Sequence, residues 1–204
     1  LDGVLRGKYA NKILDTYSDE RISIVKSVTE TAIKHGGVIG TQNKYVALLR
    51  DTLLTVARIF PKLLSFFDFY HPWQISNGLI DKSLYPNKAN GIVISQPNLD
   101  LKVDNKSFDQ YIGYNFALIV FNQNERLFND IKALESARIF ENNIHLINED
   151  SLFNKDSNFI KWRKDNNISA VIIRPDRHVY GCCDNQSMIT KVNELNKKLI
   201  SELT

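Results

Sequence analysis

Apolar residues recur at intervals of three and four along the first third of the chain, a spacing that predicts helices. Leu1–Gly7 reads as the end of a helix that a glycine stops, and Lys8–Tyr17 as a short helix. A longer apolar stripe follows Ser18, which we expect to cap that helix, and it ends at His35–Gly37. A third helix is predicted over Lys44–Phe60. The first third of the chain is therefore expected to be helical.

After Asn90 the pattern alternates between strands and helices. Continuous apolar runs, as in Asn115–Phe121, are typical of strands that are covered on both faces. The predicted strands are an extended stretch at Gly91–Pro97, strands at Asn115–Phe121, Asn143–Ile147 and Ser169–Ile173, and a hairpin strand at His178–Cys183. Helices are predicted between and after them, at Glu125–Phe140, from Phe159 onward and at Gln186–Leu203.

The order β-α-β-α-β-β-α from Asn115 onward is that of a thioredoxin-like domain, a mixed sheet with helices on both faces. Right-handed crossovers and a hairpin before the last helix leave few other topologies. We therefore expect an α/β protein, with an N-terminal helical segment followed by a thioredoxin-like domain.

Composition changes between these two parts. The stretch near residues 73–89 contains Gly78 and Pro86 and few periodic apolar positions, which predicts an irregular connector. The expected organisation is a helical segment over residues 1–72, a connector over 73–89 and a domain over 90–204. The last part contains its own strands and covering helices, so we expect it to fold independently.

Charge and length exclude several classes of protein. The chain has 204 residues, with 26 basic and 23 acidic side chains scattered along it, so no basic surface for nucleic acid is expected. No apolar run approaches the roughly 18 residues of a membrane span, and the first residues do not resemble a signal peptide. The only methionine is Met188, so we expect the chain to begin inside a longer polypeptide.

Two adjacent cysteines, Cys182 and Cys183, are the only ones in the chain. Neighbouring cysteines rarely pair with each other, which favours a reducing compartment and a cytoplasmic location. On a strand their side chains point to opposite faces. No Cys-x-x-Cys follows the first predicted strand, where dithiol exchange needs one, so a thiol oxidoreductase is disfavoured and packing is the expected role.

Other reactive residues form no complete site. The four histidines lack the spacing of metal ligands, so no metal-ligating residue is assigned. Asp176 beside His178 is compatible with an acid–base pair, but an aspartate in a turn usually caps its own backbone. The glycine-rich Gly36–Gly40 follows a helix rather than a strand, which favours a C-terminal cap over a phosphate-binding loop. A dense group of aromatic residues could line a pocket, although core or interface packing is favoured: Phe60, Phe66, Phe67, Phe69, Tyr70 and Trp73.

Four segments resemble FAD-dependent aromatic-ring hydroxylases of the 3-(3-hydroxyphenyl)propionate and phenol hydroxylase branch. Leu1–Gly7 and Leu14–Arg21 are similar to the stretch that follows the second flavin motif of that family. Ile112–Ile119 resembles the family's "LG-x-x-FALL", and Val171–Val179 resembles its "LVRPD-x-HV". The order and spacing of the four segments fit the family over essentially the whole chain.

The resemblance implies the C-terminal part of an enzyme that uses NAD(P)H to reduce FAD and hydroxylates a phenolic substrate. It implies as partner the N-terminal FAD-binding part of the same polypeptide, with residues 1–72 completing the FAD and substrate region, and it allows a homodimer. The family's glycine-rich flavin motifs do not occur in this chain, so no catalytic or cofactor-binding residue is assigned, and neither FAD nor NAD(P)H is expected to bind this segment alone. The alternative is a stand-alone thioredoxin-like interaction or dimerisation module without catalytic activity.

Overall fold

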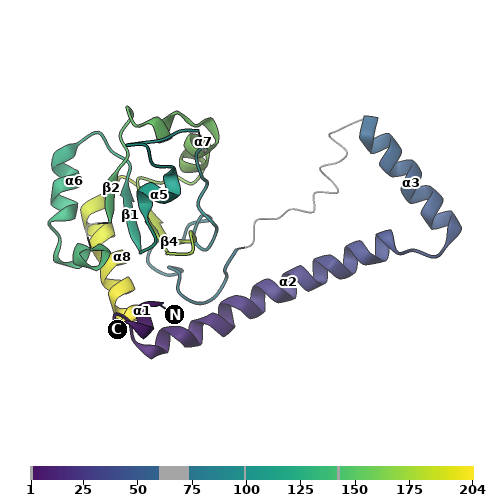
Figure 1. The fold of residues 1–204 in the computed structure, drawn as a ribbon, viewed down its shortest axis with the longest axis horizontal. Coiled ribbons are helices and arrows are strands. Elements are labelled where there is room, and N and C mark those ends of the chain that lie inside the picture. Colours follow the sequence, from purple (N-terminus) through teal and green to yellow (C-terminus); the bar gives the residue numbers. More distant parts are fainter. Residues whose placement is uncertain (1, 60–73, 99, 142) are drawn as a thin grey trace. The chain divides into compact units, whose positions relative to one another are not determined.

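The computed structural model describes residues 2–59, 74–98, 100–141 and 143–204. Contacts between residues divide the chain into two compact units (Figure 1). One unit combines residues 1–20 with residues 74–204, and the other covers residues 21–73. The predicted division at residues 72 and 90 stays a prediction about independent folding. In the structure, however, the first twenty residues belong with the C-terminal part.

Two helices account for the described part of residues 21–73. Helix α2 covers Asp15–Ile39 and helix α3 covers Lys44–Ile59, where the sequence predicted a helix from Lys44. Asn43 caps α3, since its side-chain oxygen accepts the backbone N–H of Tyr45 at 3.0 Å.

The predicted limits of α2 were wrong at both ends. The helix begins at Asp15, directly after a 3-10 turn over Asn11–Leu14, so Ser18 lies inside it rather than capping it. It also continues through Gly36 and Gly37 as far as Ile39. Glycine weakens a helix but does not forbid one, and neither glycine adopts the left-handed conformation of a helix stop.

The N-terminal residues pack against the C-terminal part. Helix α1 covers Asp2–Leu5 and ends before Gly7, which has a φ of 70°, as the glycine predicted. The backbone N–H of Ala10 donates to the carbonyl of Leu203 at 2.8 Å, beside the end of the last helix (Figure 1). The ring of Tyr9 meets that of Phe116 edge-on, with 6.1 Å between centroids. These contacts explain why residues 1–20 group with residues 74–204.

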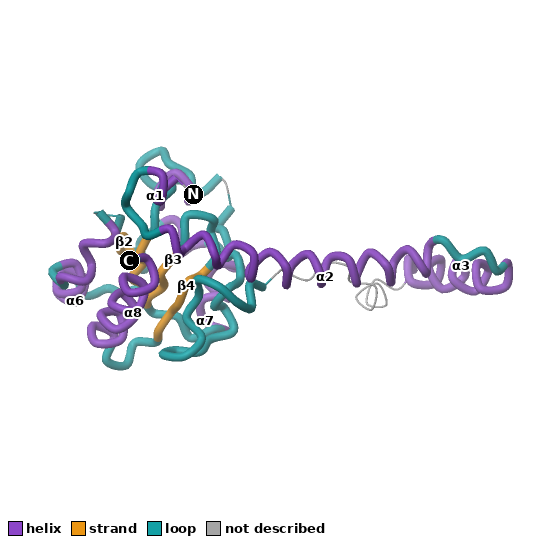
Figure 2. Tube along the Cα trace, turned by 90° about the horizontal axis from the view of Figure 1, so that it is seen from below, coloured by secondary structure: helices purple, strands orange, loops and turns teal. Residues whose placement is uncertain are grey.

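A four-stranded mixed sheet forms the centre of this unit (Figure 2). Its strands are β1 Ala117–Val120, β2 Ile144–Leu146, β3 Ala170–Ile173 and β4 Val179–Cys183, in the order β2-β1-β3-β4. β1 pairs with β2 in parallel, and the pairs β1–β3 and β3–β4 are antiparallel. The predicted α/β class and element order are confirmed, and the thioredoxin-like designation stays a prediction.

Helices cover both faces of the sheet, as expected. They are α5 Phe108–Ile112, α6 Glu125–Lys132, α7 Ser157–Asp165 and α8 Met188–Leu203. The helix predicted over Glu125–Phe140 divides into α6 and a 3-10 helix at Glu135–Phe140. Helix α5 was not predicted, because five residues are too few to display a helical period.

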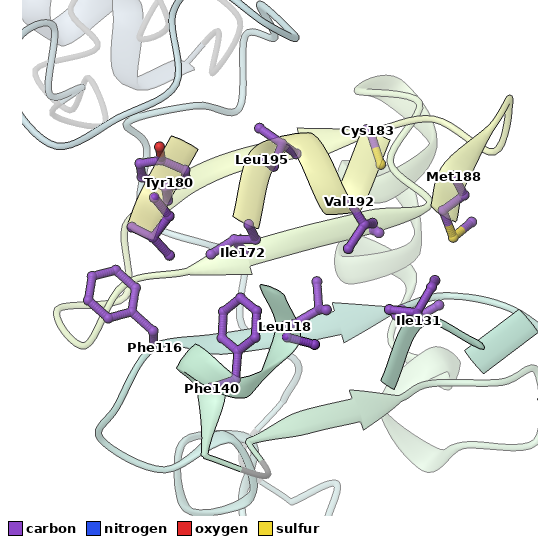
Figure 3. Close-up of a cluster of buried hydrophobic side chains, with 14 of the residues drawn as sticks. Phe116, Leu118, Ile131, Phe140, Ile172, Tyr180, Cys183, Met188, Val192 and Leu195 are labelled. Atoms are coloured by element: carbon purple, nitrogen blue, oxygen red, sulfur yellow. The ribbon is translucent and has the colours of Figure 1, made fainter. Parts of the chain in front are cut away.

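Alternating side chains of the strands build one hydrophobic cluster on each face. Leu118 and Val120 of β1 join residues of α6 and α8 on one face, including Val192 and Leu195 (Figure 3). Ala117 and Ile119 join residues of α5 and α7 on the other face. All four strand residues are fully buried, which is why β1 reads as a continuous apolar run.

The predicted connector over residues 73–89 is irregular in its described part, but it is not a loose linker. Ile75, Leu79 and Ile80 are buried. The Asp81 carboxylate is buried as well and binds the Lys198 ammonium at 2.6 Å. Beyond it, Gly91–Pro97 forms only an isolated bridge, in which Val93 pairs with His178. The segment after residue 73 is therefore part of the core of the α/β unit.

Candidate functional site

A cavity of about 870 Å³ lies at the edge of the sheet where β1 begins and β3 ends. Its lining comes from the first twenty residues, from Leu79, from the approach to β1 and from the turn after β3. All of these residues belong to one compact unit. The cavity is therefore a feature of the α/β unit itself.

The four segments that resemble aromatic-ring hydroxylases all contribute to this cavity, which we call the four-motif cavity. Its lining residues from these segments are Asp2, Gly3, Val4 and Arg6 from the first, Leu14, Thr16, Tyr17 and Glu20 from the second, Tyr114, Asn115 and Phe116 from the third, and Arg174, Pro175 and Asp176 from the fourth. Lys8, Tyr9, Ile13 and Leu79 complete it. Segments up to about 170 residues apart thus meet around one space.

A buried ion pair joins the second segment to the fourth. The two guanidinium nitrogens Nη1 and Nη2 of Arg174 donate to the two carboxylate oxygens of Glu20 at 2.7 and 2.8 Å. Both residues are only 8% exposed. Glu20 also accepts the backbone N–H of Leu79 at 2.9 Å. A planar, bidentate pair of this kind fixes orientation as well as distance.

Every N–H group of the Arg174 guanidinium has an acceptor. Besides Glu20, Nη1 donates to the Leu79 carbonyl at 3.0 Å, and Nε and Nη2 donate to Asp176 at 3.2 and 2.8 Å. Burial by itself would lower the pKa of Arg174, but the two carboxylates outweigh it and raise that pKa. With all its donors engaged, Arg174 acts as a structural connection between three segments rather than as a receptor for an anion.

Asp176 and His178 lie in contact, so the acid–base pair considered from the sequence is geometrically possible. The ring Nδ1 of His178 is 3.4 Å from Oδ1 of Asp176, which also accepts the His178 backbone N–H at 3.3 Å. Burial opposes ionisation of Asp176, but the His178 ring and the Arg174 guanidinium lower its pKa to about 2. The carboxylate is thus committed to its own turn and to Arg174, which favours the capping role.

Glu20 is the residue that sequence reasoning missed. The sequence pattern assigned no site role to Glu20, whereas the structure makes it the counter-ion of Arg174. The available signal was that both residues stand in segments with a resemblance to one family. Nothing in the spacing predicted that the two segments meet.

The two cysteines lie on opposite faces of β4, as predicted, and both are free thiols. Burial raises the pKa of Cys183 to about 12 and raises that of Cys182 as well. Neither thiol is therefore poised as a nucleophile. Among the described residues, no group of three or more His, Cys, Asp or Glu side chains is arranged to hold a metal ion.

The glycine-rich run offers no cradle for the phosphates of a flavin. Gly36 and Gly37 lie inside α2, and a Cβ atom at either position would meet nothing within 4 Å. A dinucleotide site needs a glycine turn between a strand and a helix, with the backbone close to the pyrophosphate. This run therefore does not fit FAD. Its last residue, Gly40, directly follows the end of α2 at Ile39, whereas Gly36 and Gly37, at which the helix was predicted to stop, lie inside it.

The predicted aromatic region, Phe60–Trp73, lies outside the described residues. No helix in the described ranges has both the length and the apolar composition needed to cross a bilayer. The four-motif cavity is consequently the site where the sequence resemblance and the geometry coincide.

Known proteins with similar sequences are aromatic hydroxylases. The chain is 31% identical over 132 residues to a 3-(3-hydroxy-phenyl)propionate/3-hydroxycinnamic acid hydroxylase from Mycolicibacterium smegmatis, a match that covers 62% of this chain and 24% of the relative. Proteins of the same name from Mycobacterium sp. strain JLS and Escherichia coli O157:H7 are 26% and 24% identical and cover 90% and 94% of this chain. The chain spans between a quarter and two fifths of the length of these relatives.

A similar fold occurs in the rebeccamycin biosynthetic enzyme RebC. The structure of that enzyme with reduced flavin matches 95% of this chain and 38% of its own, with a TM-score of 0.52 and 15% identity. Its substrate-free form gives a TM-score of 0.53. A family model described as the HcaD C-terminal domain matches residues 91–198, more than half of the chain. This protein therefore belongs to the HcaD C-terminal domain family.

Proposed function

We propose that this chain serves as the C-terminal part of a FAD- and NAD(P)H-dependent monooxygenase that hydroxylates a phenolic aromatic substrate. Its role in that enzyme is structural, or it lies in supporting a homodimer. The partner is the N-terminal FAD-binding part of the same polypeptide. The two buried, unpaired cysteines favour a cytoplasmic location for the whole protein.

The convergence of the four segments on one cavity carries this proposal. Each segment alone resembles the hydroxylases only modestly, and local composition could produce such a likeness by chance. The segments line the same space, however, and the Glu20–Arg174 pair connects two of them through a buried bidentate contact. The four segments thus form one site in this chain, and the hydroxylases from Mycobacterium sp. strain JLS and Escherichia coli O157:H7 match 90% and 94% of the chain that contains them.

The proposal expects no redox chemistry from this chain alone. The chain's glycine-rich run does not fit a flavin, and its thiols are buried. We therefore expect that titrating the 204-residue chain with FAD leaves the flavin fluorescence without a saturable change. Binding in the micromolar range would mean that the cofactor site has been misplaced.

The decisive experiment is to read the coding region immediately upstream and to produce the polypeptide that it encodes. The proposal expects an open frame with a Gly-x-Gly-x-x-Gly motif, whose product purifies yellow and oxidises NAD(P)H when a 3-hydroxyphenyl carboxylic acid is added. An upstream region without such a frame would contradict the proposal and would leave the stand-alone interaction module as the better explanation.

A further inference from the structure

A second cavity, of about 470 Å³, lies at the opposite end of β1 from the four-motif cavity. The residues that directly follow β1 and β2 line it, together with the end of α7 and the approach to β3. β1 and β2 run parallel, so their carboxyl ends open at this same edge. In α/β sheets, ligands bind outside the carboxyl ends of the strands.

The lining of this cavity is polar. Its amide and hydroxyl side chains are those of Asn122, Gln123, Asn148, Asn167, Ser169 and Asn185. Its charged side chains are Glu149, Arg163 and Lys164, which leaves an excess of one positive charge. A cavity of this composition suits a small polar ligand that carries negative charge.

The two cations are available for such a ligand. No ion pair found within the described ranges involves Arg163 or Lys164. The Arg163 guanidinium lies over the ring of Phe121, 5.2 Å from its centroid. Phe121 is itself buried and packs against Phe159, with 5.8 Å between ring centroids. An arginine held by its face on a fixed ring keeps its N–H edge free for hydrogen bonds.

Two asparagines have their oxygen atoms engaged. Oδ1 of Asn122 accepts the backbone N–H of Asn124 at 2.8 Å, and Oδ1 of Asn148 accepts the backbone N–H of Ser151 at 3.0 Å. The NH₂ groups of these two side chains remain as hydrogen-bond donors. The cavity thus presents more donors than acceptors.

We propose that this cavity binds a small oxyanion, either a carboxylate or a phosphate compound, through Arg163, Lys164 and the amide groups of Asn122 and Asn148. The site is independent of the proposed hydroxylase function, because none of the residues that argue for it lines the four-motif cavity.

The test is a titration of the ¹⁵N-labelled 204-residue chain, followed by the NMR shifts of its backbone amides. Inorganic phosphate and succinate are the two probes, and sodium chloride at matched ionic strength is the reference. We expect saturable shifts at residues 121–123 and 147–149 with at least one probe and none with chloride. The probe that binds identifies the phosphate or the carboxylate as the ligand group.

Charge variants on α7 show whether binding uses the proposed cations. Arg163→Gln and Lys164→Gln should each weaken binding by about two- to fivefold, as the loss of one exposed ion pair predicts. Lys161→Gln removes the same charge from an exposed position of α7 outside the cavity and should bind like the wild type. The proposal fails if neither probe gives saturable shifts, or if both cavity variants bind as tightly as Lys161→Gln. Lys164 is exposed, so its variant keeps the test valid even if Arg163→Gln does not fold.

Discussion

Single side chains decide how the N-terminal residues are held in this protein. The Glu20–Arg174 pair is almost completely removed from water, and three residues supply hydrogen-bond acceptors to the guanidinium. Bringing both charges into the interior is costly, and their mutual contact offsets that cost only while both are present. The pair is therefore more sensitive to the loss of one partner than to the loss of both.

Removal of one partner should destabilise the fold strongly. We expect Glu20→Gln or Arg174→Met to lower the free energy of unfolding by about 3–5 kcal/mol, because each breaks the buried bidentate ion pair by removing one of its charges. The double variant Glu20→Met with Arg174→Met should lose less than the sum of the two single changes. Urea unfolding followed by tryptophan fluorescence measures all three.

The control for these variants is Arg6→Ala, which breaks an exposed ion pair with Asp2 and should change stability little. If Glu20→Gln were as stable as Arg6→Ala, the buried pair would contribute nothing to holding the first segment.

His145 makes stability depend on pH. Burial, with a smaller contribution from Lys106, lowers the pKa of the His145 ring from 6.5 to about 4. Between these two values the unfolded chain binds a proton that the folded chain does not, so stability falls as the pH drops from 6.5 to 4 and then levels off. Because the ring is partly exposed, we expect a loss of about 1–2 kcal/mol in this window.

His145→Gln should remove most of this slope, whereas His35→Gln, on α2, should retain it. Unfolding free energies measured at half-unit steps of pH test the difference. Asp176 affects stability in a separate pH range. Its pKa is lower in the folded chain than in the unfolded one, so the carboxylate stabilises the fold above about pH 3.8, and this stabilisation is lost as the pH falls to about 2. An identical slope in His145→Gln and wild type would show that another group is responsible.

At the scale of elements, α2 shows that glycine does not by itself end a helix. Gly36 and Gly37 lie in its last turns, with helical backbone and no neighbour near their missing Cβ atoms. The carbonyl of Gly36 still accepts a helical hydrogen bond, from the N–H of Gly40 at 2.8 Å. The predicted C-terminal cap would instead place a glycine at positive φ, where alanine is strained.

Replacing these glycines tests whether they lie inside the helix, as in the structure, or cap its end, as the sequence predicted. Gly36→Ala and Gly37→Ala should each stabilise α2 by about 1 kcal/mol, because alanine loses less backbone entropy in a helix. Circular dichroism at 222 nm should show unchanged or increased helix content, and the helix signal should be lost at a higher temperature than in the wild type. Gly7→Ala is the contrasting variant and should destabilise, since Gly7 has a φ of 70°. Destabilisation by Gly36→Ala would support a cap at this position after all.

Strand β4 places its two thiols in different clusters of the core. Cys183 packs with the residues of α8, and Cys182 packs on the other face, where its Sγ donates to Oδ1 of Asn90 at 3.3 Å. Each thiol therefore has a packing role, on its own face of the strand. The strand also contains a β-bulge, which shifts the register between Ile172 and Ile173, so that Val179 pairs with Ile173 and Tyr180 is the extra residue.

The thiols should be dispensable for the fold and unreactive in it. A Cys182→Ser and Cys183→Ser double variant should fold with a loss of about 1–2 kcal/mol, because serine hydroxyls are costlier to bury. The native chain should react with a thiol reagent only on unfolding, as the raised pKa of both thiols predicts. Insulin-reducing activity that disappears in the double variant would restore the oxidoreductase hypothesis.

On the scale of the whole molecule, residues 74–90 decide where the α/β unit begins. Backbone hydrogen bonds join this segment to the rest of the unit: the Asp81 N–H donates to the Tyr180 carbonyl of β4 at 2.7 Å, and the Ile75 N–H donates to the Gly91 carbonyl at 2.8 Å. Asn90 donates to the carbonyls of Asp81 and Tyr85 at 2.9 and 3.0 Å. A polypeptide that starts at residue 90 lacks these partners.

Limited proteolysis should therefore leave a resistant fragment that retains residues 74–90. We expect mass spectrometry to place its N-terminus at or before Gln74, since later bonds lie in packed backbone. In urea, a polypeptide of residues 74–204 should be more stable than one of residues 90–204. A resistant fragment that begins near residue 90 would instead support the autonomous domain that the sequence predicted.

The sequence by itself determined the α/β class, the order of strands and helices, and the opposite placement of Cys182 and Cys183. These depend on the local period of apolar residues, as in the unbroken run that became β1, and local periods can be read from neighbouring residues. The tertiary structure alone decided that residues 74–90 are core, that α2 passes through two glycines, and that Glu20 meets Arg174 across 154 positions. Such contacts depend on which surfaces pack together, and a buried charge reveals its partner only when the chain has folded around both.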